Sequence, residues 1–499
     1  MQASGETPTS SGTEILDVLV IGAGFSGVCM GVKLLEAGIT DFVILEKEKG
    51  IGGTWYKNSY PGAVCDVPSH FYCFSFAPNP DWSRVYSPQP EIQAYIKKCA
   101  DDFGVTPYIQ FDSGVEQVVF NDQNQIWSVH LPDGRAYSAR HLVIGSGGLN
   151  TPSVPEITGL ENFEGPVFHT AKWRHDVDLN NKKIIVIGSA ASAIQAVPKL
   201  AEIAENVVMF QRTPNYIAPR KDRAYTQAEK DAFRKSSFRL KMLRWKIFWR
   251  FDLLLAPLFK RSSWMRPRVT RFIDDYMKTV IKDPGLHQKL TPSYELGCKR
   301  ILISDDFYPA LTRDNVSVVT EGIKEITQKT VIDDTGFHHE ADIIVMATGF
   351  NLKKQMASID LVGRDGRSLR KLWADEVSAY HGAMVPGFPN AYFVTGPNTG
   401  VGSTSIVFMI ESQIGFIMRC LKEAGRRKLI EPTEEATLSH NRMMQKDLSQ
   451  TVWATDCKSW YKDEAGRIET LYPHTARRFK QQKRRLNKTD FHIASKTIT

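Results

Sequence analysis

A glycine turn between a short apolar run and a helical pattern constrains the fold of this chain more than any other feature. The apolar run 16–21 ends at Gly22-x-Gly24-x-x-Gly27, and a second apolar run after the helical pattern ends on Glu46. The glycines permit a tight turn, close approach of backbone N–H groups to a pyrophosphate, and close packing of helix on strand. Because Glu46 stands where a carboxylate can accept ribose hydroxyls, the pattern predicts a βαβ unit that binds a dinucleotide.

A second unit of this kind begins about 160 residues later. The apolar run 184–187 leads into Gly188-Ser189-Ala190-Ala191-Ser192-Ala193, in which alanine replaces the second and third glycines. We expect Ala190 to narrow the approach of the backbone to phosphate. The next strand, 207–210, is followed by Arg212, with no acid where NAD would need one. Since a guanidinium can hold a 2′-phosphate bidentately, the pattern favours NADPH over NADH; the alternative is a surface arginine.

The chain length and the spacing of the two units predict an α/β fold with two dinucleotide-binding, Rossmann-like, three-layer domains, one inserted in the other. A chain of 499 residues is longer than one hydrophobic core supports. A third apolar run, 343–346, is assigned to the first domain, which C-terminal sequence then completes. The predicted segments are 1–150 and 339–499 for the first domain, 151–219 and 291–338 for the second, and 220–290 for a helical insertion.

The composition is that of a soluble globular protein, with 42% apolar and 24% charged residues. The cysteines number seven and include no C-x-x-C pair, which favours a reducing compartment and argues against a disulfide framework, a dithiol redox centre and a metal site. Cys65 and Cys298 are interpreted as packing residues. Residues 1–13 show no secretory signal, and no run reaches the about 18 apolar residues of a spanning helix, so a cytoplasmic location is expected.

Positive charge is concentrated in one segment. Residues 234–271 hold twelve Lys/Arg and one acid, so this segment has a net charge of +11. The whole chain has a net charge of +8, so the remaining residues sum to −3. This distribution argues against nucleic-acid binding. Pro257 and Pro267 are expected to break the helical pattern of this segment. Its apolar residues recur at helical spacing, at Leu240, Leu243, Ile247, Phe251, Leu254 and Leu258.

Two interpretations of this basic aromatic segment stay open. The first is a helical insertion that packs over a substrate cavity. The second is an interfacial helix, within 238–266, that places apolar residues in lipid and Lys/Arg at anionic headgroups, so that the protein is peripheral to a membrane.

Two further segments carry a resemblance to a known family. The stretch from Gly52-Gly53-Thr54-Trp55 to Asp66 is similar at every fixed position to the long fingerprint of the type I Baeyer–Villiger monooxygenases, which are class B flavoprotein monooxygenases. Phe163-x-Gly165-x-x-x-His169-x-x-x-Trp173 resembles their second fingerprint. The related amine- and sulfide-oxidising enzymes have Tyr or Phe where Trp173 stands. Arg174 departs from the family, which usually has Pro or Asp there. The resemblance runs from about residue 16 to 472.

The resemblance implies FAD and NADPH as cofactors and a ketone and O2 as substrates. It implies that NADPH reduces FAD, that oxygen adds at the C4a position of the flavin, and that this peroxide attacks the ketone to give an ester or lactone. Arg300 would face the flavin with Asp66 as its partner, Lys299 would bind the 2′-phosphate with Arg212 and Thr213, and His169 would belong to the linker between domains. Physically, a fixed guanidinium stabilises the anionic peroxide, and shielding from water prevents its decay.

The residues expected to carry the chemistry are therefore Arg300 and Asp66. Trp460 resembles a mobile C-terminal tryptophan that closes over the nicotinamide. The residues expected to contact the cofactors are Gly22, Gly24, Phe25, Ser26, Gly27, Glu46, Lys47, Gly53, Thr54, Trp55, Asp66, Tyr72, Gly188, Ser189, Ala190, Ser192, Ala193, Arg212, Thr213, Lys299 and Trp460. Two alternatives stay open: oxygenation of a sulfide or amine, and a flavoprotein that works as an NADPH oxidase or a membrane-surface module. No local motif identifies the ketone, which the basic aromatic segment suggests is lipophilic, or the oligomeric state.

Overall fold

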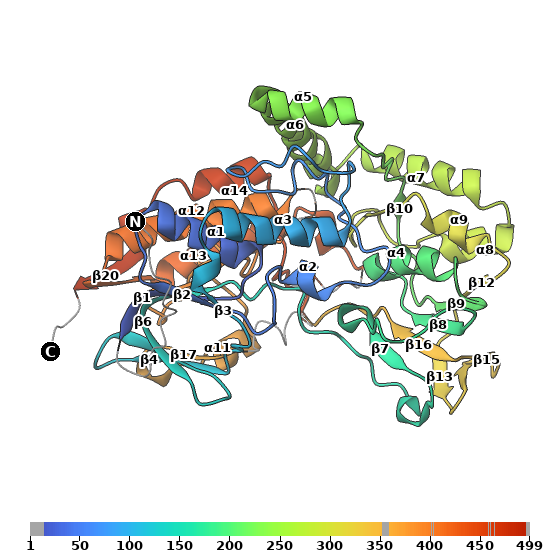
Figure 1. The fold of residues 1–499 in the computed structure, drawn as a ribbon, viewed down its shortest axis with the longest axis horizontal. Coiled ribbons are helices and arrows are strands. Elements are labelled where there is room, and N and C mark those ends of the chain that lie inside the picture. The colour runs from blue at the N-terminus through green and yellow to red at the C-terminus, as the bar shows by residue number, and fades with distance from the viewer. Residues whose placement is uncertain are drawn as a thin grey trace.

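The computed structural model describes residues 14–351, 359–400, 402, 404–457, 459, 461–463 and 465–495. Both predicted βαβ units are present. In the first, β1 (Ile15–Ile21), α1 (Phe25–Glu36) and β2 (Phe42–Leu45) follow one another, and the two strands pair in parallel. In the second, β8 (Lys183–Ile187), α4 (Ala191–Leu200) and β9 (Asn206–Phe210) do the same. Figure 1 shows the two units in separate halves of the molecule.

The first sheet combines a parallel part around β1 with an antiparallel meander. Strand β1 pairs in parallel with β2 and β6, while β4, β5 and β6 pair in antiparallel fashion. Along the sheet the order is β17 (Asp360–Val362), β4 (Gln117–Asn121), β5 (Ile126–His130), β6 (Ala136–Ile144), β1, β2 and β3 (Ile109–Gln110), with β18 (Ala391–Phe393) also paired to β6. The C-terminal sequence completes this sheet through β17 and β18.

The second sheet is parallel throughout and has five strands. Their order is β12 (Val316–Val319), β9, β8, β16 (Ile343–Met346) and β7 (Val167–His169). The assignment of the apolar run 343–346 to the first domain was therefore wrong, because β16 lies between β8 and β7 in the second sheet. A short, fully buried apolar run shows that a strand is central but carries no information on which sheet it joins.

Helices and a core layer cover each face of the first sheet. On one face α1, α3 (Gln89–Asp102) and α12 (Ile406–Ala424) pack on the strands around a large buried core. On the other face a second core joins β4, β5 and β6 to α11 (Leu369–Asp375). The alternation of apolar residues along the meander, for example in β4, matches a sheet in which one side faces this second core. The result is a three-layer domain.

The second domain is also layered but uses a small sheet in place of one helical layer. Helix α4 and α9 (Phe307–Leu311) pack with β8, β9 and β12 in one core. The opposite face is covered by the antiparallel strands β13 (Ile323–Ile326), β14 (Thr330–Asp333) and β15 (His338–Glu340), which contribute Ile326 and Val331 to another buried core.

A helical insertion leaves and re-enters the second domain at one point. Strand β10 (Ile217–Ala218) pairs in parallel with β11 (Leu302–Ile303), so the two ends of the insertion lie together. Its helices are α5 (Gln227–Lys235), α6 (Ser237–Trp249), α7 (Arg266–Val280) and α8 (Pro284–Leu290). Pro257 and Pro267 lie in the first turns of helical segments, consistent with the expected breaks.

The predicted apolar stripe of the insertion is correct at its ends and wrong at Leu254. Leu240 and Leu258 are buried, whereas Leu254 is 52% exposed. The cause is a π-helical turn at Arg250–Leu255. Because such a turn holds more residues than an α-helical turn, it shifts the residues after it around the helix axis, and a count at α-helical spacing no longer predicts the buried side.

The C-terminal part of the chain packs against α12 and the sheets. It contains β19 (Lys428–Pro432), α13 (Glu434–Leu448), α14 (Ala476–Gln482) and β20 (Phe491–Ser495), with β19 and β20 paired in antiparallel fashion. Within the described residues, no helix combines the length and the apolar character needed to cross a membrane.

Candidate active site

The first glycine turn packs so closely that its third glycine has no substitute. A Cβ atom at Gly27 would lie 1.9 Å from the carbonyl oxygen of Gly22, within the same turn. Gly24 is the N-cap residue of α1, and in the described part of the chain no side chain caps this end and no acid lies in its first turn. The free N–H groups and the helix dipole at Gly24, Phe25 and Ser26 therefore suit an anion such as a pyrophosphate.

Glu46, at the end of β2, ties the strand to this turn. Its buried carboxylate accepts hydrogen bonds from the backbone N–H groups of Ala23 (2.7 Å) and Glu48 (2.9 Å), one on each oxygen. A carboxylate has further lone pairs, so these bonds leave capacity for ribose hydroxyls. The neighbouring Lys47 is exposed, and partial desolvation by the protein and the charge of Lys57 lower its pKa.

The segment 52–72, which contains the first fingerprint (52–66), lies against the same turn. Gly53 is the N-cap residue of α2 (Thr54–Lys57). The indole Nε1 of Trp55 donates a hydrogen bond to the Tyr72 hydroxyl at 3.1 Å, and the Tyr72 ring stands edge-on to Phe25 with centroids 5.4 Å apart. Burial raises the pKa of Tyr72, so its hydroxyl stays protonated and able to donate.

The second turn has the backbone of the first despite its alanines. Gly188 has a φ of +113°, and a Cβ there would lie 2.4 Å from the oxygen of Ala347, so glycine is required. Ala190, however, has φ −89° and ψ −158°, which is the extended conformation of Gly24 (φ −83°, ψ −163°). Alanine therefore introduces no backbone strain at this position. Ala193 is fully buried against the strands.

Polar contacts connect the second turn to the segments around it. The Ser189 hydroxyl donates to the carbonyl oxygen of Thr213 at 3.2 Å, and Asn215 donates to the carbonyl oxygen of Ser189 at 3.0 Å. The Tyr60 hydroxyl donates to Oε1 of Gln195 on α4, in the same helix as Ser192, at 2.8 Å, and burial raises the pKa of Tyr60 to about 12. These contacts hold the turn and its helix against the segment that follows β9 and against the loop of the first domain that contains Tyr60.

Arg212 and Lys299 form a pair of cations beside this turn. Burial lowers the pKa of Lys299, and the charge of Arg212 lowers it further. The Lys299 ammonium lies 4.8 Å from the centroid of the Tyr294 ring. Neither cation forms an ion pair with a carboxylate among the described residues. Two neighbouring cations without a carboxylate suit a dianionic group such as a 2′-phosphate.

The structure brings Arg300 and Asp66 together across 234 residues of sequence. Arg300 precedes β11, and Asp66 lies in the loop after α2. Nε and Nη2 of Arg300 both donate to Oδ2 of Asp66, at 2.8 Å and 2.6 Å. The charge of Asp66 is the main cause that raises the pKa of Arg300, so the guanidinium is charged at every working pH. The two side chains are 38% and 31% exposed, so the pair stays accessible to a small molecule.

Tyr461 is a site residue that sequence reasoning missed. Its side chain is buried beside Arg300, whose charge and backbone N–H act to lower the pKa of the phenol, although burial raises it on balance. No motif marks this tyrosine; its position one residue after Trp460 was the available signal. Trp460 itself lies outside the described residues.

A disulfide bond next to Arg300 overturns one expectation. Cys298 is bonded to Cys457, at a Cα–Cα distance of 6.4 Å. The interpretation of Cys298 as a packing residue was wrong, and one disulfide is present although the cysteine count argued against a disulfide framework, because a pair separated by 159 residues leaves no local spacing signal. Cys65 is a buried free thiol, as are the other described cysteines, Cys29, Cys73, Cys99 and Cys420.

The second fingerprint lies in the second domain. His169 ends β7, is buried, and accepts a hydrogen bond from the Ala171 backbone at Nδ1 (3.0 Å). Trp173 packs edge-on to Phe168, with centroids 5.0 Å apart. Arg174, the departure from the family pattern, is half exposed and paired with Asp176 at the surface.

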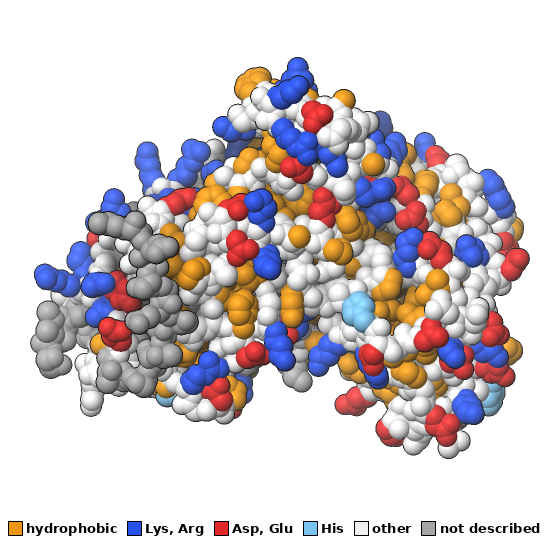
Figure 2. Space-filling model, viewed as in Figure 1, with side chains coloured by type: hydrophobic (Ala, Val, Ile, Leu, Met, Phe, Trp, Pro, Cys, Tyr) orange, Lys and Arg blue, Asp and Glu red, His pale blue; other side chains and the backbone are white. Residues whose placement is uncertain are grey.

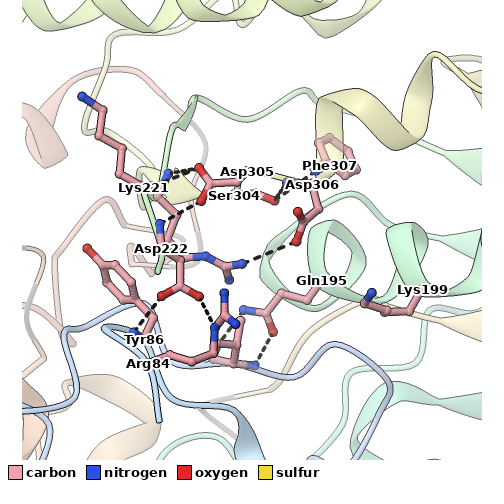
Figure 3. Close-up of polar contacts among 12 residues, drawn as sticks. Arg84, Tyr86, Gln195, Lys199, Lys221, Asp222, Ser304, Asp305, Asp306 and Phe307 are labelled. Atoms are coloured by element: carbon pink, nitrogen blue, oxygen red, sulfur yellow. Dashed lines mark hydrogen bonds and ion pairs between the residues drawn. The ribbon is translucent and has the colours of Figure 1, made fainter. Parts of the chain in front are cut away.

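A polar network, also not anticipated from the sequence, joins the two domains where the insertion begins (Figure 3). The Asp305 carboxylate accepts three backbone N–H groups, from Arg220, Lys221 and Asp222, each at 2.9 Å. The nearly buried Asp222 carboxylate in turn accepts from Arg84 of the first domain at 2.8 Å. This network borders a cavity of about 490 Å³ between the domains. It therefore anchors the insertion to both halves of the molecule.

Comparison with known proteins defines the class to which this fold and site belong. Residues 19–227 match the family model for pyridine nucleotide-disulphide oxidoreductases. Among solved structures, the fold matches an oxidized steroid monooxygenase bound to NADP, with a TM-score of 0.86 and 28% identity over 97% of this chain and 100% of the other. It also matches a cyclohexanone monooxygenase from Rhodococcus bound to NADP+, with a TM-score of 0.86 and 27% identity over 97% and 99%. The protein is thus a flavin- and NADPH-dependent monooxygenase.

Sequence relatives narrow the class further. The chain is 41% identical over 96% of its length to a Baeyer–Villiger monooxygenase of Streptomyces coelicolor, covering 93% of that protein. It is 39% identical over 99% of its length to a Baeyer–Villiger monooxygenase of Pseudomonas aeruginosa, covering 94% of that protein. The chain belongs to the Baeyer–Villiger monooxygenase family, and its cofactors are FAD and NADP, as predicted from its sequence.

Proposed function

We propose that this enzyme inserts one oxygen atom beside the carbonyl of a lipophilic ketone, giving an ester or lactone, and that Arg300 and Asp66 carry the oxygenation step. The observation that carries this proposal is the Arg300–Asp66 contact, in which two N–H groups meet one carboxylate oxygen at 2.8 Å and 2.6 Å. When bound, FAD takes a hydride from NADPH and activates molecular oxygen.

Arg300 supplies fixed positive charge where the reaction develops negative charge on oxygen. A guanidinium has five N–H donors, and Asp66 occupies two of them, so others remain for a substrate or reacting oxygen. Because the donors are held before the reaction starts, little reorganisation is needed as the charge develops. Asp66 is a positioning residue, which keeps the guanidinium from turning into solvent.

The cofactor assignments follow from the two turns. We assign FAD to the turn 22–27 with Glu46, Lys47 and the segment 53–72, since Tyr72 packs on Phe25 and Trp55 packs on Tyr72. We assign NADPH to the turn 188–193 with Thr213, and its 2′-phosphate to Arg212 and Lys299. The absence of a neighbouring carboxylate among the described residues supports a phosphate at this pair, because two cations repel each other unless an anion lies between them.

The preference for a lipophilic substrate is supported by aromatic side chains near Tyr72. Phe71 lies 6.0 Å from both Phe248 and Phe251 of the insertion, and 6.3 Å from Phe408 at the start of α12, between ring centroids. These rings come from three segments that are distant in sequence. An apolar cluster of this kind excludes water from its surroundings, which supports an apolar substrate for a site beside it.

Oxygenation of a sulfide or amine is the alternative activity. Trp173, where the amine- and sulfide-oxidising enzymes have Tyr or Phe, and the Arg300–Asp66 pair favour the ketone. An NADPH oxidase was the second alternative, which rested on Arg174 and Ala190. Arg174 is paired with Asp176 at the surface, and Ala190 has the conformation of Gly24, so neither supports a loss of oxygenation.

A competition assay tests the proposal. The holoenzyme receives NADPH, O2 and a mixture of one ketone and one sulfide of equal size. The ester, the oxidised sulfide and hydrogen peroxide are then quantified. We expect ester to form in the wild type, and Arg300→Ala to lose it while the flavin is still reduced by NADPH at a normal or moderately slowed rate. Arg174→Ala, which removes a surface arginine with its own aspartate partner, is the matched control. Ester formation by Arg300→Ala at a rate comparable to wild type would remove Arg300 from the mechanism.

A further inference from the structure

The insertion exposes an unusual share of the large apolar side chains of this protein. The described residues expose fourteen such side chains, and six of them lie between residues 238 and 272. Each of the six is at least half exposed: Phe238, Trp245, Leu253, Leu254, Trp264 and Phe272. Figure 2 shows hydrophobic and basic side chains together on the helices that project at the top of the view. Apolar side chains gathered on a projecting element point to an interaction surface.

On α6 these residues share one face. Phe238 and Trp245 are seven residues apart, which is close to two helical turns, and the π-helical turn at 250–255 brings Leu253 close to the same line. Trp245 stands edge-on to Trp249, with centroids 5.9 Å apart. We refer to Phe238, Trp245, Leu253 and Leu254, with the cations beside them, as the basic aromatic face.

The opposite side of α6 is held firmly by the rest of the protein. Leu240 is buried, and Phe248 packs at 5.1 Å from Phe408. Arg244 donates from Nη1 to the carbonyl oxygens of His70 (3.1 Å) and Cys73 (2.9 Å). These contacts orient α6, so the outward direction of the basic aromatic face is a fixed property of the fold.

The cations on this face have no partner within the described part of the protein. The ion pairs of the segment involve Arg234, which contacts Asp81, and Arg266, which contacts Glu295. The exposed Arg239, Lys241, Lys246 and Arg250 make no ion pair with any carboxylate among the described residues. An exposed apolar stripe flanked by unpaired cations is complementary to a surface that is apolar inside and anionic outside.

We propose that the basic aromatic face docks this enzyme on an anionic lipid membrane, an interaction that goes beyond its oxygenase activity. Trp245 and Phe238 would insert at the level of the headgroups, while Lys241 and Lys246 contact lipid phosphates. Charge disfavours a second copy of the chain as the occupant, since a symmetric contact would set two segments of net charge +11 against each other. The aliphatic Leu253 and Leu254 favour a bilayer over a nucleic acid.

Vesicle flotation of the full-length holoenzyme tests the proposal. We expect the protein to float with vesicles of phosphatidylcholine and phosphatidylglycerol at low salt, to dissociate as salt rises, and not to float with phosphatidylcholine alone. Lys241→Glu/Lys246→Glu should weaken binding at least about 30-fold, because each cation contributes about 1 kcal/mol near an anionic surface and the introduced carboxylates add repulsion. Phe238→Ser/Trp245→Ser should also lose most of the binding, while FAD content and NADPH consumption in solution stay at wild-type values.

The matched controls lie on the second domain. Phe337→Ser removes another exposed aromatic ring. Lys324→Glu/Lys329→Glu reverses the charge at two exposed positions outside the insertion. Both controls should float as wild type does. Failure of the wild type to bind anionic vesicles at low salt, or equal binding by the Phe238/Trp245 variant, would overturn the proposal. So would a dimer by light scattering that Phe238→Ser/Trp245→Ser converts to monomer, because the face would then join two copies.

Discussion

Cys298 and Cys457 are joined by a disulfide bond, which links the C-terminal segment around Tyr461 to the segment before β11 that contains Arg300. Cys298 lies two residues before Arg300, and Cys457 lies four residues before Tyr461. The bond closes a loop across 159 residues, which begins after the last helix of the insertion. Two parts of the site that are remote in sequence are therefore covalently linked.

Breaking this bond should loosen the C-terminal segment. In the chain-entropy account, a crosslink over a loop longer than 100 residues contributes about 4–5 kcal/mol to stability. We expect Cys457→Ser, or a thiol reductant on the wild type, to lower the unfolding temperature by several degrees and to speed proteolysis around residues 457–467. Cys420→Ser, which alters a buried free thiol, serves as the control for the loss of a sulfur atom. Unchanged proteolysis after reduction would show that the bond does not hold the segment.

Asp66→Asn should impair oxygenation without impairing reduction of the flavin. Asparagine keeps the size of the side chain but removes the charge that orients Arg300, and a small misplacement of a catalytic group costs about 100-fold in rate. Stopped-flow spectroscopy should show normal reduction by NADPH, while ester formation falls by about that factor and hydrogen peroxide release rises. The control is Asp176→Asn, which disrupts the Arg174–Asp176 pair at the surface. Equal losses in both variants would contradict a special role of Asp66.

Arg212→Ala and Lys299→Ala should change the choice between nicotinamide cofactors. Loss of a charged partner of a phosphate costs roughly 2–5 kcal/mol, so the KM for NADPH should rise at least about 30-fold. The KM for NADH, which has no 2′-phosphate, should change little or fall. Steady-state kinetics with both cofactors measures this, and Lys289→Ala, a cation whose ammonium donates to the carbonyl oxygen of Val318, is a control. A parallel rise of both KM values would place the phosphate elsewhere.

Lys483→Met should stabilise the protein. Lys483 is 2% exposed, and burial lowers its pKa well below the usual value, although its ammonium lies 3.3 Å from the centroid of the Phe479 ring. Since the unfolded chain binds this proton more tightly than the folded chain, the lysine costs stability below its ordinary pKa, and the cost grows as pH falls towards the folded pKa. Methionine keeps the apolar stem and should add about 1–3 kcal/mol.

Urea unfolding at two pH values measures this effect. The gain from Lys483→Met should be larger at pH 6 than at pH 9, because the unfolded wild type holds a proton on this lysine that the folded protein binds less tightly, so wild-type stability falls as pH falls. The pKa of His440, which burial and the charge of Lys483 lower to about 4, should rise in the variant. Exposed Lys480→Met is the control. A variant less stable than wild type at pH 6 would show that the cation–ring contact outweighs the cost of burial.

Local sequence was sufficient for the elements that depend on neighbouring residues. The two strand–turn–helix units are at the predicted positions, because glycine spacing and apolar runs set backbone conformation within a few residues. The fingerprint segment and the family followed from consecutive residues in the same way. Local sequence did not predict which side of the insertion helix is buried, since the π-helical turn at 250–255 rotates Leu254 outward.

By itself, the sequence determined that this protein has two dinucleotide turns and which residues, Arg300 and Asp66 among them, have the right chemistry. The family resemblance also implied that Arg300 and Asp66 meet, whereas only the tertiary structure decided the other contacts of the site. The tertiary structure placed β16 in the second sheet, joined Cys298 to Cys457, and set Tyr461 beside Arg300. The reason is physical: backbone conformation follows from neighbours along the chain, whereas contacts across 159 or 234 residues depend on how whole domains pack.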